Sequence, residues 1–461
     1  MAPTGTPPAV ETTSGDDVGN PYLEGPFAPV REERTDDHEL PLEGALPPGL
    51  DGRLLRIGPN PATTPADPDR YHWLTGDGMV HAVDLADGRA VGYRNRFVRT
   101  RALARQAGTP APRGPRGPVD GPANANVAHH AGRLLALDGV GLPLALGADL
   151  TTARVHDFDG ALTSPVAPHP KRDLDGGLVL VGSDVFGPPF LRTHLVDRDG
   201  RLVRSDDIDV GRATLVHDVG LTGRSLVLFD LPVVFDLALA VGAGAMPYRW
   251  MPDLGARVGV VDRHGGADVR WLPVEPCFVS HVANAYDDGD DVVVDLVCYA
   301  SAFAGRGERP STTTGLLTRW RLSAAGQVSA EQLDDRPVEL PRTAEDVQGR
   351  PYRYAYGVLL DDQSTPAPTP TALVKYDLAR DESARFAPGP GRIPSEAIFV
   401  PAVDGRGEDE GWVLTVVEDL ARGASDLVVL DATSFSGPPV ATVHLPARVP
   451  LGLHGTWLPA G

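Results

Sequence analysis

The sequence predicts an all-β protein, because short apolar runs alternate with turn signals along most of its length. Runs rich in β-branched residues recur from about residue 52 onward, among them 225–230, 291–299 and 426–431. Asp-Gly pairs at 87–88 and 199–200 lie between such runs, and this residue pair favours tight hairpin turns. No amphipathic helical pattern exceeds about three turns. The 52 glycines and 45 prolines are spread along the chain, as many short strands require.

The length limits the architecture. About 400 residues of strand-rich sequence can form several sandwiches in a row or one large radial fold. A propeller blade takes about 40–60 residues, so about seven blades fit, although no blade signature repeats at a fixed period. Two segments resemble insertions rather than blades: residues 102–126, rich in Pro, Gly and Arg, and residues 231–254.

The composition excludes several classes of function. The net charge of −20 argues against a nucleic-acid partner, because phosphate binding needs basic patches. Two cysteines are too few for a disulfide framework or a thiolate metal site. No secretory signal pattern opens the chain and no apolar run reaches about 18 residues, so a soluble cytoplasmic protein is expected. Residues 1–20 have the composition of a disordered tail, which leaves 21–461 as a single domain.

Thirteen histidines are candidate metal ligands. Four of them lie where a strand-like run meets a turn: His169, His217, His281 and His454. They are 48, 64 and 173 residues apart, whereas helical metal motifs place ligands at much closer spacings. Widely separated strand-end ligands imply a fold that converges on one axis, as a propeller does. Spacing alone does not separate them from four others near strand ends: His72, His81, His129 and His130.

A series of motifs runs through the chain. Residues 56–61 (RIGPNP) are followed by 71–83 (YHWLTGDGMVHAV) and 93–100 (YRNRFVRT). Further on come 124–137 (NANVAHHAGRLLAL), His-Pro-Lys at 169–171, His-Asp at 217–218 and His-Gly-Thr-Trp at 454–457. In these motifs and their order the chain resembles the carotenoid cleavage oxygenase family, which includes retinal pigment epithelial membrane protein and bacterial carotenoid, apocarotenoid and stilbene dioxygenases. The resemblance covers about residues 20 to 460.

This resemblance implies a seven-bladed β-propeller, with loops and short helices over its top face and one Fe(II) on its axis. Carried over motif by motif, the iron ligands are His169, His217, His281 and His454, and the other histidines are structural. Four neutral imidazoles leave two positions of an octahedral Fe(II) open, enough to bring O2 beside a substrate double bond. The implied reaction is cleavage of a C=C bond by O2 to give two carbonyl products.

The same resemblance implies carboxylates that accept the imidazole N–H and fix each ring. Two match here, Glu339 and Glu396. The family's first glutamate follows the Leu-Leu-Ala-Leu run, and in this chain Gly139 takes its place with Asp138 one residue early. Alternation along a strand would turn Asp138 to the opposite face. We therefore expect one ligand, His217, to lack its carboxylate, and Gly139→Glu to tighten iron binding.

Three positions bear on the substrate. Asp138 stands where stilbene-cleaving relatives carry a lysine that helps bind the phenol, and Phe97 stands where they tend to have a more polar aromatic residue. Both favour an apolar polyene, a carotenoid or apocarotenoid, over a phenolic stilbene. Ala125 replaces a threonine that many relatives carry near the open iron site, which predicts a less crowded coordination position.

Residues 231–241 form the most apolar stretch outside the expected strands and are too short to span a bilayer. The resemblance implies that Phe235 and Leu237 belong to a patch that rests on membranes and admits substrate, with shallow contact because the surroundings are acidic. The alternative is a buried cover over the propeller. The missing glutamate also motivates a different function, a propeller without catalysis that binds apocarotenoids or other lipids.

Overall fold

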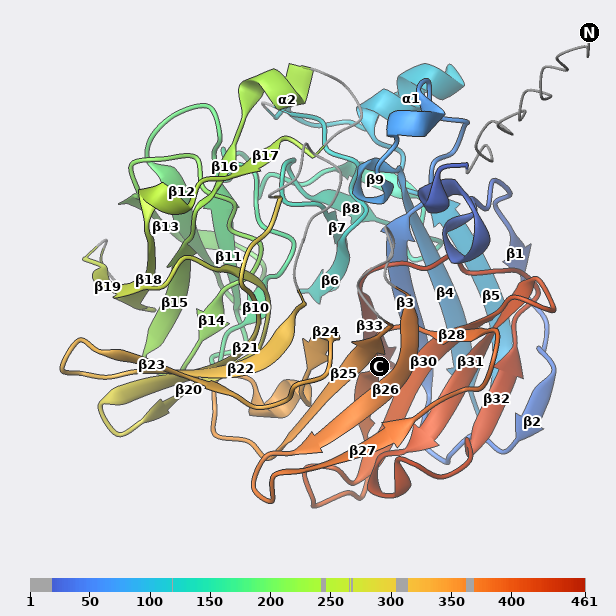
Figure 1. Ribbon diagram of the computed structural model, residues 1–461. Helices are drawn as coiled ribbons and strands as arrows, with labels where there is room; N and C mark the ends of the chain where they lie inside the picture. The colour runs from blue at the N-terminus through green and yellow to red at the C-terminus, as the bar shows by residue number, and fades with distance from the viewer. Residues whose placement is uncertain are drawn as a thin grey trace, which may run out of the picture.

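The computed structural model describes residues 19–117, 119–241, 246–264, 266, 268–303, 314–361 and 369–460. Residues 1–18, most of the expected disordered tail, lie outside the described ones. Seven antiparallel sheets form a β-propeller (Figure 1), which confirms the predicted fold class.

The first three sheets contain the early part of the chain and its last strand. They consist of β1 (Thr35–Asp36), β5 (Arg89–Phe97), β4 (Gly78–Ala86), β3 (Gly52–Pro59) and β33 (Gly455–Pro459); β6 (Asn126–His130), β7 (Arg133–Leu137), β8 (Leu144–Leu146) and β9 (Thr152–Val155); and β10 (Lys171–Arg172), β11 (Leu178–Ser183), β12 (Phe190–Val196) and β13 (Leu202–Asp209).

The other four sheets follow in chain order, except that β2 joins the last of them. They consist of β14 (Gly220–Leu221), β15 (Ser225–Asp230), β18 (Ala256–Asp262) and β19 (Arg270–Val274); β20 (Phe278–Asp288), β21 (Asp291–Tyr299), β22 (Leu316–Leu322) and β23 (Val328–Gln332); β24 (Val338–Arg342), β25 (Tyr354–Leu360), β26 (Pro370–Asp377) and β27 (Glu382–Phe386); and β2 (Leu42–Gly44), β32 (Ala441–His444), β31 (Ala424–Asp431), β30 (Gly411–Asp419), β28 (Arg392–Pro394) and β29 (Ile398–Pro401).

Two strand pairings close the ring. β33 adds to β3, with Arg56 opposite Gly455, and β2 adds to β32, with Leu42 opposite Val443. The C-terminal strand β33 is therefore the edge strand of an N-terminal sheet, and the N-terminal strand β2 is the edge strand of the last sheet. In Figure 1 the C-terminal strand β33 lies beside the blue β3.

The core lies between neighbouring sheets. Val258 and Val294 pack in one cluster between the sheets of β18 and β21, and Tyr93 and Leu427 pack in another where the ring closes. Strand β21 is buried along most of its length. A strand covered on both faces needs apolar side chains at successive positions, which explains the continuous apolar run at 291–299.

The helices are short and lie outside the sheets. α1 (Arg101–Ala107) and α2 (Leu237–Val241) lie at the same end of the molecule, where the hairpin of β16 (Val233–Phe235) and β17 (Tyr248–Trp250) also lies (Figure 1). None of the described helices is long and apolar enough to cross a membrane. Single 3-10 turns complete the described elements: η1 (Pro21–Leu23), η2 (Gly25–Phe27), η3 (Pro68–Arg70), η4 (Trp73–Thr75), η5 (Pro252–Leu254), η6 (Glu345–Val347) and η7 (Ala432–Ser434).

Candidate metal centre

The propeller brings four distant histidines into one cluster. The Nε2 atoms of His169 and His217 are 3.3 Å apart, and those of His281 and His454 are 3.2 Å apart. The ring centroids of His169 and His454 are 4.4 Å apart, which joins the two pairs. Ring nitrogens of His169, His217 and His281 lie within 4.8 Å of one another, so these three can hold a metal ion. Nε2 of His454 reaches the same group.

The strands that position these rings stand at the edges of their sheets. His169, His217 and His454 come just before β10, β14 and β33, each an edge strand. His281 differs from the expected strand–turn boundary, because it lies inside β20. The pairing of β20 with β21 shifts between Val279 and Val282 and again between Val282 and Asn284, so the strand is irregular where it carries the histidine.

Neighbouring segments hold the backbone at two of the candidate ligands, His169 and His454. Asn126 Nδ2 donates to the carbonyl oxygen of Pro168 (2.8 Å), directly before His169. Ile57 N donates to the carbonyl oxygen of His454 (2.9 Å), and Arg56 Nη1 donates to that of Leu453 (3.1 Å). The RIGPNP motif therefore anchors the last ligand at the point where the propeller closes.

The stretch before His217 is anchored by the apolar insertion. Leu215 N donates to the carbonyl oxygen of Val233 (2.8 Å), and the hydroxyl of Thr214 donates to that of Leu231 (2.6 Å). Leu231 and Val233 are buried. The first part of residues 231–241 is thus a structural brace for the stretch before His217.

Two glutamates, the buried Glu396 and the partly buried Glu339, orient two of the rings. Nδ1 of His281 lies 2.6 Å from Glu339 Oε2, and Nδ1 of His454 lies 2.8 Å from Glu396 Oε1. Each carboxylate accepts the Nδ1–H of its imidazole, which leaves Nε2 of the neutral ring unprotonated and close to the other rings. That is the tautomer a metal ligand needs.

Further hydrogen bonds and an ion pair support both carboxylates. The Tyr299 hydroxyl donates to Glu339 Oε1, and Leu340 N donates to Oε2 (3.0 Å). Gly455 N donates to Glu396 Oε2 (2.8 Å), and Arg342 Nη1 lies 3.9 Å from Oε1. Gly455 belongs to the His-Gly-Thr-Trp motif at 454–457, whereas no sequence pattern marked Tyr299 or Arg342.

Charge and burial favour the neutral, ligating form of most of the cluster. Burial, then the charges of neighbouring histidines, lowers the pKa of His169 and His217, and burial also lowers that of His454. Burial opposes protonation of His281 too, but the adjacent Glu339 outweighs it and raises that pKa. Burial alone would raise the pKa of the two glutamates, yet His281 brings that of Glu339 to about 2, and Arg342 with His454 does the same for Glu396.

These shifts predict that acid destabilises the metal-free protein. A histidine whose folded pKa lies below 6.5, such as His169, is protonated more readily in the unfolded chain, so the fold loses stability as pH falls below 6.5. Glu339 and Glu396 stabilise the fold above their ordinary pKa of 4.5 and lose this as pH falls towards 2. His281, with a raised pKa, has the opposite sign. We expect the urea midpoint of the metal-free protein to fall continuously from about pH 7 to about pH 3, and a constant midpoint would contradict these assignments.

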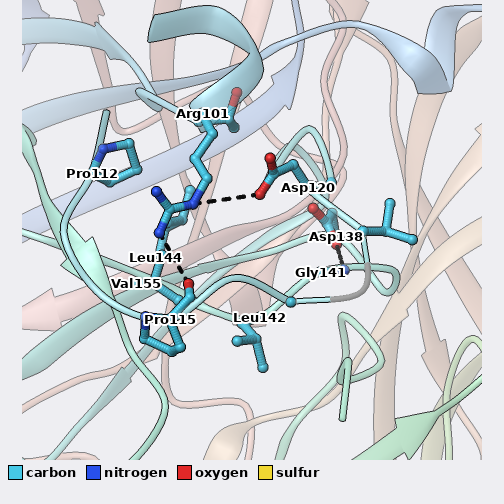
Figure 2. Close-up of a pocket in the computed structure, with 13 residues that line it drawn as sticks. Arg101, Pro112, Pro115, Asp120, Asp138, Gly141, Leu142, Leu144 and Val155 are labelled. Carbon is cyan, nitrogen blue, oxygen red and sulfur yellow. Dashed lines mark hydrogen bonds and ion pairs between the residues drawn. The ribbon is translucent and has the colours of Figure 1, made fainter. Parts of the chain in front are cut away.

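No hydrogen bond joins a carboxylate to His169 or His217 in the described part of the chain. The chain leaves β7 at Leu137, and the Asp138 carboxylate accepts the backbone N–H groups of Ala123, Val140 and Gly141, each at 2.8 Å. Asp138 and Gly141 help line a pocket beneath α1 with Arg101 and Asp120 (Figure 2). None of the four histidines lines this pocket, so Asp138 is committed to the local turn.

Gly139 cannot simply be exchanged for the missing glutamate. Its φ is +91°, a backbone conformation that L side chains rarely adopt, and an added Cβ would lie 3.2 Å from Pro168 Cδ. Contrary to the expectation from sequence, we predict that Gly139→Glu costs about 1–3 kcal/mol of unfolding free energy and does not tighten metal binding. Urea unfolding and metal titration of this variant test the point, and tighter binding would show that the turn rearranges.

The remaining predicted residues lie in three different surroundings. Phe97 is buried in a small cluster with Met79 and Leu103. Ala125 is buried directly before β6, and its role beside an open coordination position stays a prediction. Phe235 is half-buried on β16, with its ring 6.2 Å from those of Phe186 and Tyr248, and Leu237 on α2 is 63% exposed.

Three of the other four strand-end histidines have structural partners. His72 Nδ1 accepts from Leu74 N (3.2 Å) at the start of η4, and His81 Nδ1 pairs with the hydroxyl of Tyr93 (2.9 Å). His130 Nε2 pairs with the carbonyl oxygen of Asp197 (2.7 Å). His129 lies beside it on β6, and none of these residues belongs to the cluster of four.

Comparison with known proteins identifies the family of this chain. The family model described as retinal pigment epithelial membrane protein matches residues 27–459. A carotenoid cleavage oxygenase of Mycobacterium tuberculosis is 37% identical over 95% of this chain and 98% of its own length. The chain belongs to the carotenoid cleavage oxygenase family.

Solved structures of family members share the whole fold. The structure of cobalt-substituted ACO, an apocarotenoid oxygenase of Synechocystis, has a TM-score of 0.82 and 28% identity, covering 94% of this chain and 97% of its own. The lignostilbene dioxygenase of Pseudomonas brassicacearum has a TM-score of 0.85 and 28% identity, covering 96% and 99%. This chain is therefore an enzyme of the oxygenase class, as the motifs indicated.

Proposed function

We propose that this protein is an Fe(II)-dependent dioxygenase that cleaves a C=C bond of a carotenoid or apocarotenoid and gives two carbonyl products. The observation that carries the proposal is the cluster of His169, His217, His281 and His454, with two Nδ1–H groups held by Glu339 and Glu396. An all-nitrogen set of neutral ligands suits a first-row metal such as iron. When bound, Fe(II) would activate O2 beside the double bond of the substrate.

The residues of the chain supply the rest. His281 and His454 are held in one tautomer by their glutamates, and His169 and His217 are held through their backbones. Burial of His169, His281 and His454 keeps bulk water from the site. The two carboxylates also offset part of the metal charge, which four neutral imidazoles would leave uncompensated.

A row of aromatic rings supports an apolar substrate. Successive ring contacts run from Phe186, which is 57% exposed, to the metal centre, with centroids 5.8–6.2 Å apart at each step. The last ring is that of Tyr299, whose hydroxyl binds Glu339. We call it the aromatic row: Phe186, Phe235, Tyr248, Phe303, Phe278 and Tyr299. Five of the six rings pack in one apolar cluster, and we propose that an apolar polyene approaches the metal along this cluster.

The outer end of this row joins an exposed apolar patch. Leu237 is 63% and Val241 79% exposed, and Met251 and Leu254 are also exposed nearby on the chain. We propose that this patch lets a cytoplasmic protein rest reversibly on membranes that contain the substrate. The net charge of −20 makes attraction to anionic headgroups weak, so apolar insertion has to supply the binding.

Flotation with neutral phosphatidylcholine liposomes tests this patch. We expect the protein to float and the Leu237→Asp/Val241→Asp variant to stay at the bottom, because a carboxylate resists insertion. The matched control is Val403→Asp, since Val403 is 77% exposed and lies in the connection between β29 and β30, outside the patch. Equal flotation of all three proteins would show that the patch does not contact lipid.

A phenolic stilbene is the second candidate substrate, since the two structural relatives have nearly equal TM-scores. The phenol-binding lysine of stilbene-cleaving relatives has no counterpart, because the only lysines of the chain, Lys171 and Lys375, are paired with Asp218 and Asp409. We therefore expect iron-loaded protein to prefer an apocarotenal over a hydroxystilbene by about tenfold or more in kcat/KM. A preference for the stilbene would reverse the substrate assignment without affecting the metal site.

A further inference from the structure

A buried ion pair lies between the ligand segments. Lys171 Nζ lies 2.8 Å from Asp218 Oδ1, and the two side chains are only 10% and 2% exposed. Lys171 follows His169 by two residues, and Asp218 follows His217 directly. The pair therefore cross-links the two histidines that have no carboxylate on their rings.

The same carboxylate reaches a third ligand segment. Asp218 Oδ2 accepts the backbone N–H of Val282 (2.7 Å), and Oδ1 also accepts that of Val219 (2.7 Å). Val282 follows His281, at the point where the pairing of β20 with β21 is irregular. Asp218 thus holds the backbone at Val219, after His217, and at Val282, after His281. Glu339 holds the His281 ring.

The choice of lysine at residue 171 is informative. Of the 42 basic residues in the chain only two are lysines, and every other cation is an arginine. A guanidinium is planar and carries five N–H donors that need partners, whereas an ammonium is a compact point charge. A buried site that provides one carboxylate oxygen therefore suits a lysine better than an arginine.

Stability alone does not explain the pair. Removing two charges from water commonly costs as much as their attraction returns, so a buried ion pair adds little stability over apolar residues of similar size. What it adds is a fixed geometry, because each buried charged group has few alternative partners. Here the fixed elements are the backbones of three metal-ligand segments.

We propose that the Lys171–Asp218 pair is the positioning element for His169 and His217, and holds through the backbone what Glu339 and Glu396 hold through the rings. The inference rests on the proposed metal site. Neither residue contacts the metal position in this account, so both act through the histidines.

Cobalt binding to the purified full-length protein tests this proposal, with chelator competition for affinity and the visible Co(II) absorption bands for ligand geometry. We expect Lys171→Met to weaken Co(II) binding about tenfold or more and to change the band intensities. The matched control is Lys375→Met, because Lys375 has the same 10% side-chain exposure and a single carboxylate partner, Asp409 at 2.5 Å. This variant should lose comparable thermal stability and keep the parent affinity and spectrum.

The double variant Lys171→Met/Asp218→Asn separates positioning from an unpaired charge. It leaves no buried charge alone, so it should fold even if Lys171→Met does not, and we expect its Co(II) affinity and spectrum to stay altered. Parent-like affinity and spectrum in the double variant, or in Lys171→Met itself, would overturn the proposal. Failure of the parent protein to bind Co(II) would instead overturn the metal assignment on which it rests.

Discussion

Replacing His169 with alanine should abolish product formation and weaken metal binding by more than about 100-fold, the upper end of what loss of a ligand's hydrogen-bond partner costs. His169 is the cleanest ligand to remove, because no carboxylate depends on its ring. The same change at His281 or His454 would leave Glu339 or Glu396 buried without its partner and would destabilise the fold as well.

The control for this variant is His194→Ala. His194 is 2% exposed, lies in the neighbouring β12 and has its ring bound by Ser164 and Ser205, so its removal also deletes a buried imidazole. We expect it to lower the melting temperature and to leave metal stoichiometry unchanged. Parent-like metal affinity in His169→Ala would show that this residue is not a ligand.

Glu396→Gln should weaken metal binding by about 10–100-fold, the second-largest effect we predict. Glu396 is 1% exposed and accepts both the His454 ring and Gly455 N. A glutamine has one oxygen for these two donors and turns an N–H towards the other, and it also removes the charge that favours a cation. Metal titration and the kcat of the loaded enzyme should fall together.

Glu418→Gln is the comparison for Glu396→Gln. Glu418 is 3% exposed and pairs with Arg448 (3.0 Å), so the substitution also neutralises a buried carboxylate in an ion pair. It should destabilise the protein and leave metal affinity at the parent value. Equal losses of metal affinity in both variants would mean that general destabilisation, rather than support of His454, accounts for the effect.

The sequence predicted the strands well because their cause is local. Residues 225–230 and 291–299 match β15 and β21, since a buried strand between turns needs a continuous apolar run. The blade count rested on length, and the structure supplies the pairing of β33 with β3 that closes the ring. That pairing joins residues about 400 positions apart, and no local pattern encodes it.

The metal centre could be predicted only through motifs. Spacing did not separate His281 from His81, because both lie in strands, and only contacts between distant segments place His281 beside His454. The roles of Tyr299 and of the Lys171–Asp218 pair depend on contacts between blades. The expected effect of Gly139→Glu changed once the backbone was known. The positive φ of Gly139 decides whether a side chain fits there, and this angle cannot be predicted from the order of residues along the chain.

Mass analysis of products formed under isotopically labelled dioxygen tests the account most directly. Iron-loaded protein would be incubated in parallel with a carotenoid, an apocarotenal and a hydroxystilbene, with the His169→Ala variant as the blank. We expect labelled aldehydes or ketones from the carotenoid or the apocarotenal, at masses that add up to the substrate plus one O2, and none from the variant. Absence of labelled product from every substrate, with iron present in the protein, would contradict the dioxygenase assignment and favour a propeller that binds apolar ligands without cleaving them.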